Sequence, residues 1–271
     1  MSDNTLPNAH PPQNSFPIIR QVKPSNILSW VKAGMQDTRQ AGLASLFYGA
    51  FFAVAGWVMK MVFDEAYGLF PGLATGFLLL GPFLAMGLYD LSRQLEHGQP
   101  AKLIPSLTAW RTNMLNVGIF AGVLGVILLI WARASLIIFA LYFQDSVFPS
   151  LNEVILSVFT FNQPVFGMVY FAVGGFFAAL VFAISVVAIP LMTDRKTDAI
   201  TAAIASIIAC TKNPFTMLLW AACIVLLVAI GFATYFVGLV ITMPIVGHAT
   251  WHVYRDIVAV ESQPNSAQSD A

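Results

Sequence analysis

The chain has 271 residues, of which 58% are hydrophobic and only 10% are charged, and its formal net charge is zero. Soluble domains carry about 25% charged residues, so a water-soluble fold of this size would lack the charge to cover its surface. The neutral balance also argues against a nucleic-acid partner. Apolar runs long enough to cross a bilayer predict an all-α, polytopic transmembrane helical bundle.

The two ends of the chain differ from its middle. Residues 1–26 are polar and proline-rich and lack the apolar stretch of a secretory signal, so we expect a disordered polar head there. Residues 259–271 are expected to form a similar disordered tail. The integral membrane domain is therefore predicted to cover residues 27–258.

Apolar runs divide this domain into membrane spans. Four runs have the length of single spans, and they cover residues 43–63, 71–89, 117–143 and 165–189. The fifth run, 215–246, would make a helix roughly 48 Å long at 1.5 Å per residue, which exceeds the ~30 Å hydrocarbon core of a bilayer. We expect this run to fold back as a hairpin near Gly231–Tyr235, which gives six spans, whereas a single tilted helix would give five.

The loops between the spans differ in charge. Basic residues precede the first span, lie between spans two and three and between spans four and five, and follow the last span. The opposite loops carry Asp64, Glu65, Asp145 and Glu153. Because basic loops stay on the cytoplasmic side, both termini are expected to face the cytoplasm, in the inner membrane of a bacterium. Residues Leu151–Pro164 are predicted to form a short helix on the outer surface.

Three segments share one layout, in which a short amphipathic helix is followed by a span, a turn and a second span. These predicted repeats cover about 27–98, 103–196 and 198–258. The second span of each repeat reaches a proline, and these prolines are Pro82, Pro190 and Pro244. Each proline is expected to distort its helix because it has no N–H to donate.

Small residues are also frequent within the spans. Gly118, Gly122 and Gly125 line the third span. We expect them to let helix backbones approach each other, which is how membrane bundles cohere.

Two motifs carry a resemblance to a known family. They are "GPFLAMGLYDLSRQLEHGQ" at the end of the second span and "GHATWHVYRD" after the last one. The chain, from about residue 27 to 258, resembles an uncharacterised domain-of-unknown-function family of bacterial, mostly proteobacterial, integral membrane proteins. More distantly it resembles the membrane domain of glycerophosphodiester phosphodiesterases. The resemblance implies location and topology and brings no catalytic residues with it.

Histidines in the second motif raise the possibility of a metal site. His248 and His252 are four residues apart, share a helix face and could reach one ion. Asp256 continues this face, and Asp90 lies at the corresponding depth of another repeat. The alternative, which we favour, is that these groups are interfacial and bind neighbouring helices, so no cofactor is expected.

Three arginines are further candidate functional residues. Arg93 with Asp90, and Arg255 with Asp256, are expected to tie helix ends together or to meet anionic headgroups. Arg133 lies near the outer end of the third span. It is expected to extend toward the membrane surface or to pair with Asp64 or Glu65; a substrate-facing role is the alternative.

The sequence shows no recognisable nucleophile–base pair, phosphate-binding glycine loop or metalloprotease motif. We therefore expect a non-enzymatic scaffold, assembly or envelope-organising protein. Its partners would be the lipid bilayer and other membrane proteins. The alternative is a transporter of a small or lipid-like solute, because repeated units and proline-interrupted spans are features of transporters.

Overall fold

The computed structural model describes residues 16–65, 70–142 and 164–259. Within these ranges the chain is helical, apart from short connections and one isolated β-bridge between Ile19 and Val258. In chain order the helices are α1 (Asn26–Ala41), α2 (Leu43–Glu65), α3 (Phe70–Glu96), α4 (Leu103–Leu107), the 3-10 helix η2 (Ala109–Asn113), α5 (Met114–Tyr142), α7 (Pro164–Ser185), α8 (Ala188–Arg195), α9 (Ala199–Lys212), α10 (Pro214–Ala233) and α11 (Leu239–Ile257). The predicted all-helical class is confirmed for the described residues.

Within the described residues, four helical segments are long and apolar enough to cross a membrane. They are Leu43–Val62, Ala109–Tyr142, Pro164–Arg195 and Pro214–Ala233. In an apolar 18-residue stretch of each segment, only 17% to 22% of the residues are buried inside the molecule. Most of the apolar surface of these helices therefore faces outward, as it does in a protein surrounded by lipid.

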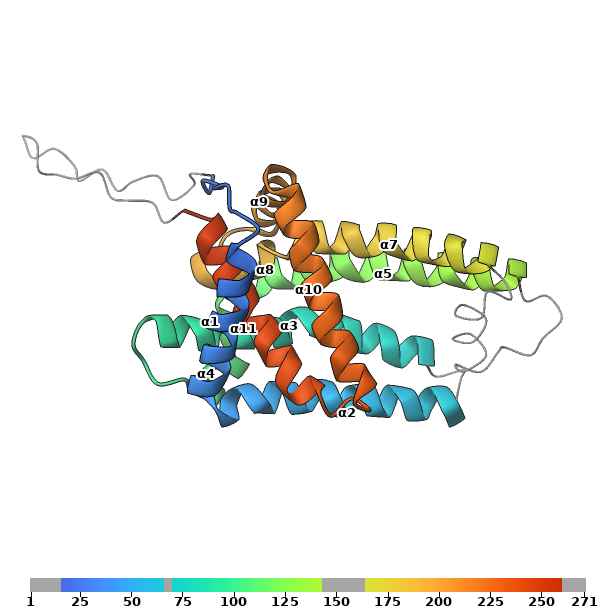
Figure 1. The fold of residues 1–271 in the computed structure, drawn as a ribbon, viewed down its shortest axis with the longest axis horizontal. Helices are drawn as coiled ribbons and strands as arrows, with labels where there is room; N and C mark the ends of the chain where they lie inside the picture. Colours follow the sequence, from blue (N-terminus) through green and yellow to red (C-terminus); the bar gives the residue numbers. More distant parts are fainter. Residues whose placement is uncertain (1–15, 66–69, 143–163, 260–271) are drawn as a thin grey trace, which may run out of the picture.

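The helices are arranged in a long bundle with a densely packed end. In Figure 1, α2, α3, α5 and α7 lie lengthwise, α10 crosses them obliquely in this view, and α1, α4, α8 and α9 gather toward the end where the described part of the chain also begins and ends. Trp30 of α1 and Trp220 of α10 are buried there and meet edge to face, with ring centroids 6.1 Å apart. We call the region formed by α1, α4, α8, α9 and the C-terminal half of α11 the packed end.

The last apolar run folds back on itself. Between α10 and α11, Tyr235 and Phe236 have positive φ angles of 51° and 68°. The Thr234 hydroxyl donates to the Gly231 carbonyl at 2.9 Å and accepts from the N–H of Gly238 at 2.8 Å, which closes the turn. The predicted hairpin is confirmed, with its turn a few residues later than expected.

Residues 16–25 were expected to belong to a disordered head, but they pack against residues that follow α11 and against its last turn. The N–H of Arg20 donates to the carbonyl of Ile257 at 2.7 Å. Asn213, between α9 and α10, accepts from the N–H of Val22 at 2.8 Å. These hydrogen bonds, one to the backbone of Ile257 and one to the side-chain Oδ1 of Asn213, hold the segment in place together with the burial of Ile19. The proline-rich composition of the segment did not reveal these partners, which lie far along the chain.

Several predicted features lie outside the described residues. They are the first 15 residues of the polar head, the tail from residue 260 onward, and the short outer helix except for Pro164, which begins α7.

The three prolines differ in their local structure. A break in the helix precedes Pro190: α7 ends at Ser185, and the N–H of Val187 is bonded to the Ser206 hydroxyl at 3.1 Å. Pro190 has no N–H to donate to the carbonyl four residues earlier, which accounts for the break. By contrast, α3 and α11 continue through Pro82 and Pro244.

Glycines permit close approach where α11 crosses α1 and α2. A Cβ added to Gly34 would lie 2.7 Å from backbone atoms of α11, and one added to Gly49 would lie 2.0 Å from the Val240 carbonyl oxygen. In α5, a Cβ added to Gly118 or Gly122 would meet nothing within 4 Å in the described structure. Gly118 and Gly122 therefore make no close helix contact within the described residues, whereas Gly125 is buried.

Candidate functional site

His248 of α11 is completely buried between serines of two other helices. Its Nε2 lies 2.7 Å from Oγ of Ser45 in α2, and its Nδ1 lies 2.7 Å from Oγ of Ser92 in α3. The Ser92 hydroxyl donates its proton to Asp37, so it accepts from the Nδ1–H of His248. Ser45 then donates to Nε2, and the ring is the neutral tautomer that a buried site favours.

Asp37 of α1 extends this chain of hydrogen bonds toward the surface. Its Oδ2 accepts from Ser92 Oγ at 2.7 Å and from Nε2 of His252 at 2.9 Å. The His252 side chain is 31% exposed and that of Asp37 is 12% exposed. We call Asp37, Ser45, Ser92, His248 and His252 the histidine network.

The histidine network joins α1, α2, α3 and α11 at the packed end. Ser45, Ser92 and His248 are each at most 1% exposed. A serine–histidine pair in this position is closed to a substrate in the described structure, and both ring nitrogens of His248 are already hydrogen-bonded. A fully connected buried network of this kind fixes the relative positions of its helices.

Sequence reasoning identified the two histidines but missed their partners. The buried positions of α1 include Trp30, Gly34, Asp37 and Ala41, so Asp37 continues the helical stripe that begins at Trp30. That spacing was an available signal. The serines carry no comparable signal, because nothing in the local sequence separates a buried serine from the apolar residues beside it.

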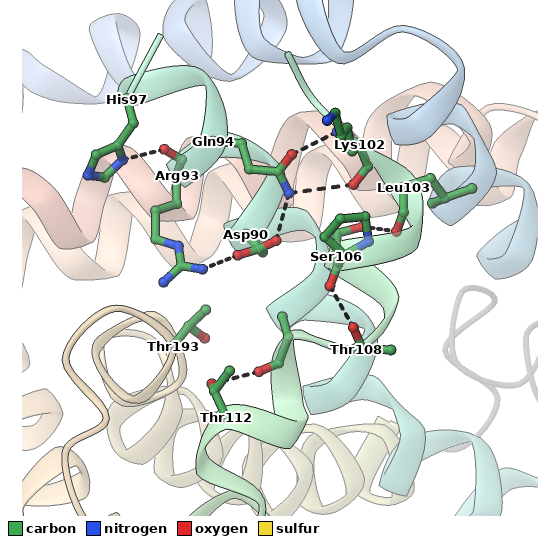
Figure 2. Close-up of polar contacts among 12 residues, drawn as sticks. Asp90, Arg93, Gln94, His97, Lys102, Leu103, Ser106, Thr108, Thr112 and Thr193 are labelled. Carbon is green, nitrogen blue, oxygen red and sulfur yellow. Dashed lines mark hydrogen bonds and ion pairs between the residues drawn. The ribbon is translucent and has the colours of Figure 1, made fainter. Parts of the chain in front are cut away.

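Asp90, suggested as a third ligand beside the histidines, has other partners. Figure 2 shows its carboxylate facing Arg93, with which it forms an ion pair, and Gln94, whose Nε2 donates to Oδ2 at 2.7 Å. Across the described residues, no three His, Cys, Asp or Glu side chains come together in a way that could hold a metal ion. The structure therefore does not assemble the suggested site from His248, His252 and Asp90.

Asp90, Arg93 and Gln94 line a cavity of about 410 Å³. The connection from α3 to α4 contributes Gln99, Pro100 and Lys102 to the lining, and α4 contributes Pro105. Gln94 holds this connection in place, since its Oε1 accepts from the backbone N–H of Lys102 at 2.7 Å. We call this space the α3–α4 cavity.

Arg255 ties helix ends together, as expected, but with partners other than Asp256. One guanidinium nitrogen lies 2.6 Å from a Glu96 carboxylate oxygen at the end of α3, and another lies 3.4 Å from Asp194 in α8. The Tyr254 hydroxyl also donates to Asp194, at 2.5 Å.

Asp256 is hydrogen-bonded to α1, because the indole N–H of Trp30 donates to the Asp256 carboxylate at 2.6 Å. The carboxylate therefore fastens α1 to the end of α11 rather than joining the histidines.

Arg133 is exposed on α5. The carboxylates of Asp64 and Glu65, its expected partners, fall outside the described side chains. That Arg133 extends toward the membrane surface or pairs with one of these carboxylates stays a prediction.

Comparison with known proteins places the chain in a membrane. Residues 69–194 match a family model described as "Predicted integral membrane protein (DUF2189)". No curated protein and no solved structure matches the chain. The family match and the four long apolar helices identify an integral membrane protein, and they support the resemblance to an uncharacterised membrane family.

Proposed function

We propose that this protein is a non-enzymatic scaffold of the bacterial inner membrane that binds the transmembrane helices of other proteins. The observation that carries the proposal is an open face on α5. Its residues share one side of the helix and are exposed, and they are Leu115, Gly118, Ile119, Gly122 and Val126. We call this the α5 glycine face.

The glycines of this face serve no helix contact within the described part of the chain. Glycines spaced four residues apart let the backbone of a second membrane helix approach closely, where van der Waals packing and weak backbone contacts stabilise the pair. Close packing against a helix of a partner protein would therefore give these glycines a role that they do not have within this chain.

The proposed topology has six spans, which are α2, α3, α5, α7, α10 and α11. The spans form three pairs, and a short helical segment precedes each pair. These segments are α1 before α2 and α3, α4 with η2 before α5 and α7, and α9 before α10 and α11. This order supports three repeats. The bridge between Ile19 and Val258 joins the two ends of the membrane domain at the packed end. Because the basic loops lie at that end, it would face the cytoplasm. We also propose that the chain is of proteobacterial origin and is distantly related to the membrane domain of glycerophosphodiester phosphodiesterases.

The closed histidine network supports the non-enzymatic part of the proposal. Its buried hydroxyls and imidazole satisfy one another, and such mutual pairing stabilises a fold without leaving a reactive group available.

Site-specific photocrosslinking in native membranes tests the proposal. A photoreactive residue at Ile119 should give a discrete protein adduct that mass spectrometry identifies. The same residue at Val225, a lipid-facing position of α10 that is 67% exposed, should give none. Gly122→Ile fills the α5 glycine face and should abolish the adduct while the helical content stays unchanged. If Ile119 yields no more protein adduct than Val225, the scaffold proposal fails.

A transporter of a small or lipid-like solute is the second candidate, and the histidine network is the observation that favours it. The network forms a continuous hydrogen-bonded chain from the partly exposed His252 to the buried Ser45, and such chains carry protons in transporters. Reconstituted vesicles would show proton-coupled uptake that Asp37→Asn abolishes. Vesicles that show no flux above empty controls would rule out this candidate.

A further inference from the structure

We infer that the α3–α4 cavity binds the phosphate group of an anionic membrane lipid. The cavity is lined by two cationic side chains, Arg93 and Lys102, and by one carboxylate, Asp90. The lining therefore carries a net charge of about +1, which matches the single negative charge of a lipid phosphodiester. This inference is independent of the proposed scaffold role.

The two cations are available to a ligand. Asp90 is only 3% exposed and holds Arg93 through a single guanidinium nitrogen, while a guanidinium carries five N–H donors. Lys102 contacts Gln94 through its backbone N–H and carbonyl, so its ammonium group takes no part in that clamp. Figure 2 shows Arg93 and Lys102 on either side of Asp90 and Gln94.

The clamp on the α3–α4 connection preorganises the cavity. Gln94 donates to Asp90 at 2.7 Å and accepts from the Lys102 backbone at 2.7 Å, so a single side chain fixes both walls. A site whose shape exists before the ligand arrives loses less conformational entropy on binding.

The surroundings of the cavity favour a lipid over free phosphate. Ile104 follows Lys102 closely and is 78% exposed, and Leu107 is exposed on the same short helix. Trp110 follows in η2, with the Arg111 guanidinium 5.4 Å from its ring centroid. Exposed apolar residues, an aromatic ring and basic groups are the composition of a helix at a membrane interface. Acyl chains can cover Ile104 and Leu107 while the headgroup enters the cavity.

The deciding experiment measures lipid binding to the purified full chain in detergent by native mass spectrometry. The probe is dioctanoyl phosphatidylglycerol, with dioctanoyl phosphatidylcholine and inorganic phosphate as comparison ligands. We expect one saturable phosphatidylglycerol site that phosphatidylcholine fills less well and that inorganic phosphate does not clear at equal concentration.

Two variants locate the site. Lys102→Gln leaves the Asp90–Arg93 pair and the backbone clamp intact and should weaken binding about fivefold, the effect of one basic residue near anionic lipid. Gln99→Trp keeps every charge but fills the cavity, and it should weaken binding at least as much. The matched control is Lys32→Gln, which removes an exposed lysine from α1 and should leave the affinity unchanged.

Three results would overturn the inference. Equal affinity of Lys102→Gln and Lys32→Gln would show that the cavity is not the site. Equal binding of phosphatidylcholine would show that anionic charge is not recognised. Displacement of the lipid by an equal concentration of inorganic phosphate would assign the cavity to free phosphate.

Discussion

His248 shows how a bundle keeps an ionisable side chain in its interior. A buried imidazole is tolerated when it is neutral and both ring nitrogens are hydrogen-bonded. Here Ser45 donates to one nitrogen and Ser92 accepts from the other, and Asp37 fixes the direction of the Ser92 proton. Each hydroxyl thus has an assigned role, and removing one leaves a buried polar atom without a partner.

Ser45→Ala is expected to lower the free energy of unfolding by about 1–3 kcal/mol, because it leaves Nε2 of His248 buried and unsatisfied. Chemical denaturation in detergent, followed by circular dichroism, measures this change. Ser29→Ala is the matched control, since Ser29 is exposed in α1, and it should stay within about 0.5 kcal/mol of the parent. Equal stability of the two variants would mean that the Ser45 bond contributes nothing.

At the residue scale, the sequence predicted part of the candidate site. The four-residue spacing of His248 and His252 placed both histidines on one face of a helix, as the structure has them. Ser45, Ser92 and Asp37 reach them across sequence separations of 203, 156 and 215 residues. Such partners follow from the tertiary fold, which local periodicity does not specify.

At the scale of elements, a helix end outside the four long apolar segments is held by a local hydrogen bond. Asp198 is the N-cap of α9, and its side chain accepts from the backbone N–H of Thr201 at 2.9 Å. This hydrogen bond lowers the pKa of Asp198 below its usual range. The ionised cap is therefore fully stabilising above the usual aspartate value of about 4, and its contribution is lost as the pH falls through the lower folded-state pKa.

Asp198→Ala should destabilise the protein by about 1 kcal/mol at neutral pH. Asp198→Asn, which caps a helix equally well without titrating, should cost little. Thermal unfolding at pH 7 and at pH 3 compares the three proteins, and the deficit of the alanine variant should shrink at the lower pH. A deficit that is constant with pH would contradict the role of the ionised cap.

Some glycines lie in close helix–helix contacts, and others face open space. Gly49→Ala places a methyl group against the Val240 carbonyl and should cost about 1–3 kcal/mol as α2 and α11 move apart. Gly122→Ala, on the α5 glycine face, should be neutral or stabilise by up to about 1 kcal/mol, because alanine favours a helix. Melting temperatures in detergent measure both changes. A loss of stability in Gly122→Ala as large as that in Gly49→Ala would refute this division.

The sequence predicted elements better than contacts. The apolar runs located the long helices, and the excess length of the last run predicted the α10–α11 hairpin because one helix would exceed the bilayer thickness. Composition was misleading for residues 16–25, whose backbone pairs with the distant C-terminal end. It was also misleading for Gly118 and Gly122, which closely approach no other helix within the described residues.

At the scale of the whole molecule, polar and apolar parts are segregated along the long axis. The histidine network, the Arg255 ion pairs and the α3–α4 cavity lie at or beside the packed end, while the long helices expose apolar side chains over most of their length. A bilayer around those helices accounts for this segregation. The basic loops at the packed end are the reason for proposing that this end faces the cytoplasm.

Single-cysteine labelling tests the proposed topology most directly. In a chain whose Cys210 and Cys223 are replaced by alanine, one cysteine is placed at Gln99 in the α3–α4 connection or at Tyr235 in the α10–α11 turn. A membrane-impermeant maleimide added to intact spheroplasts should label the Tyr235→Cys protein at once and the Gln99→Cys protein only after lysis. Labelling of Gln99→Cys in intact spheroplasts, or protection of Tyr235→Cys, would contradict six spans with both termini in the cytoplasm.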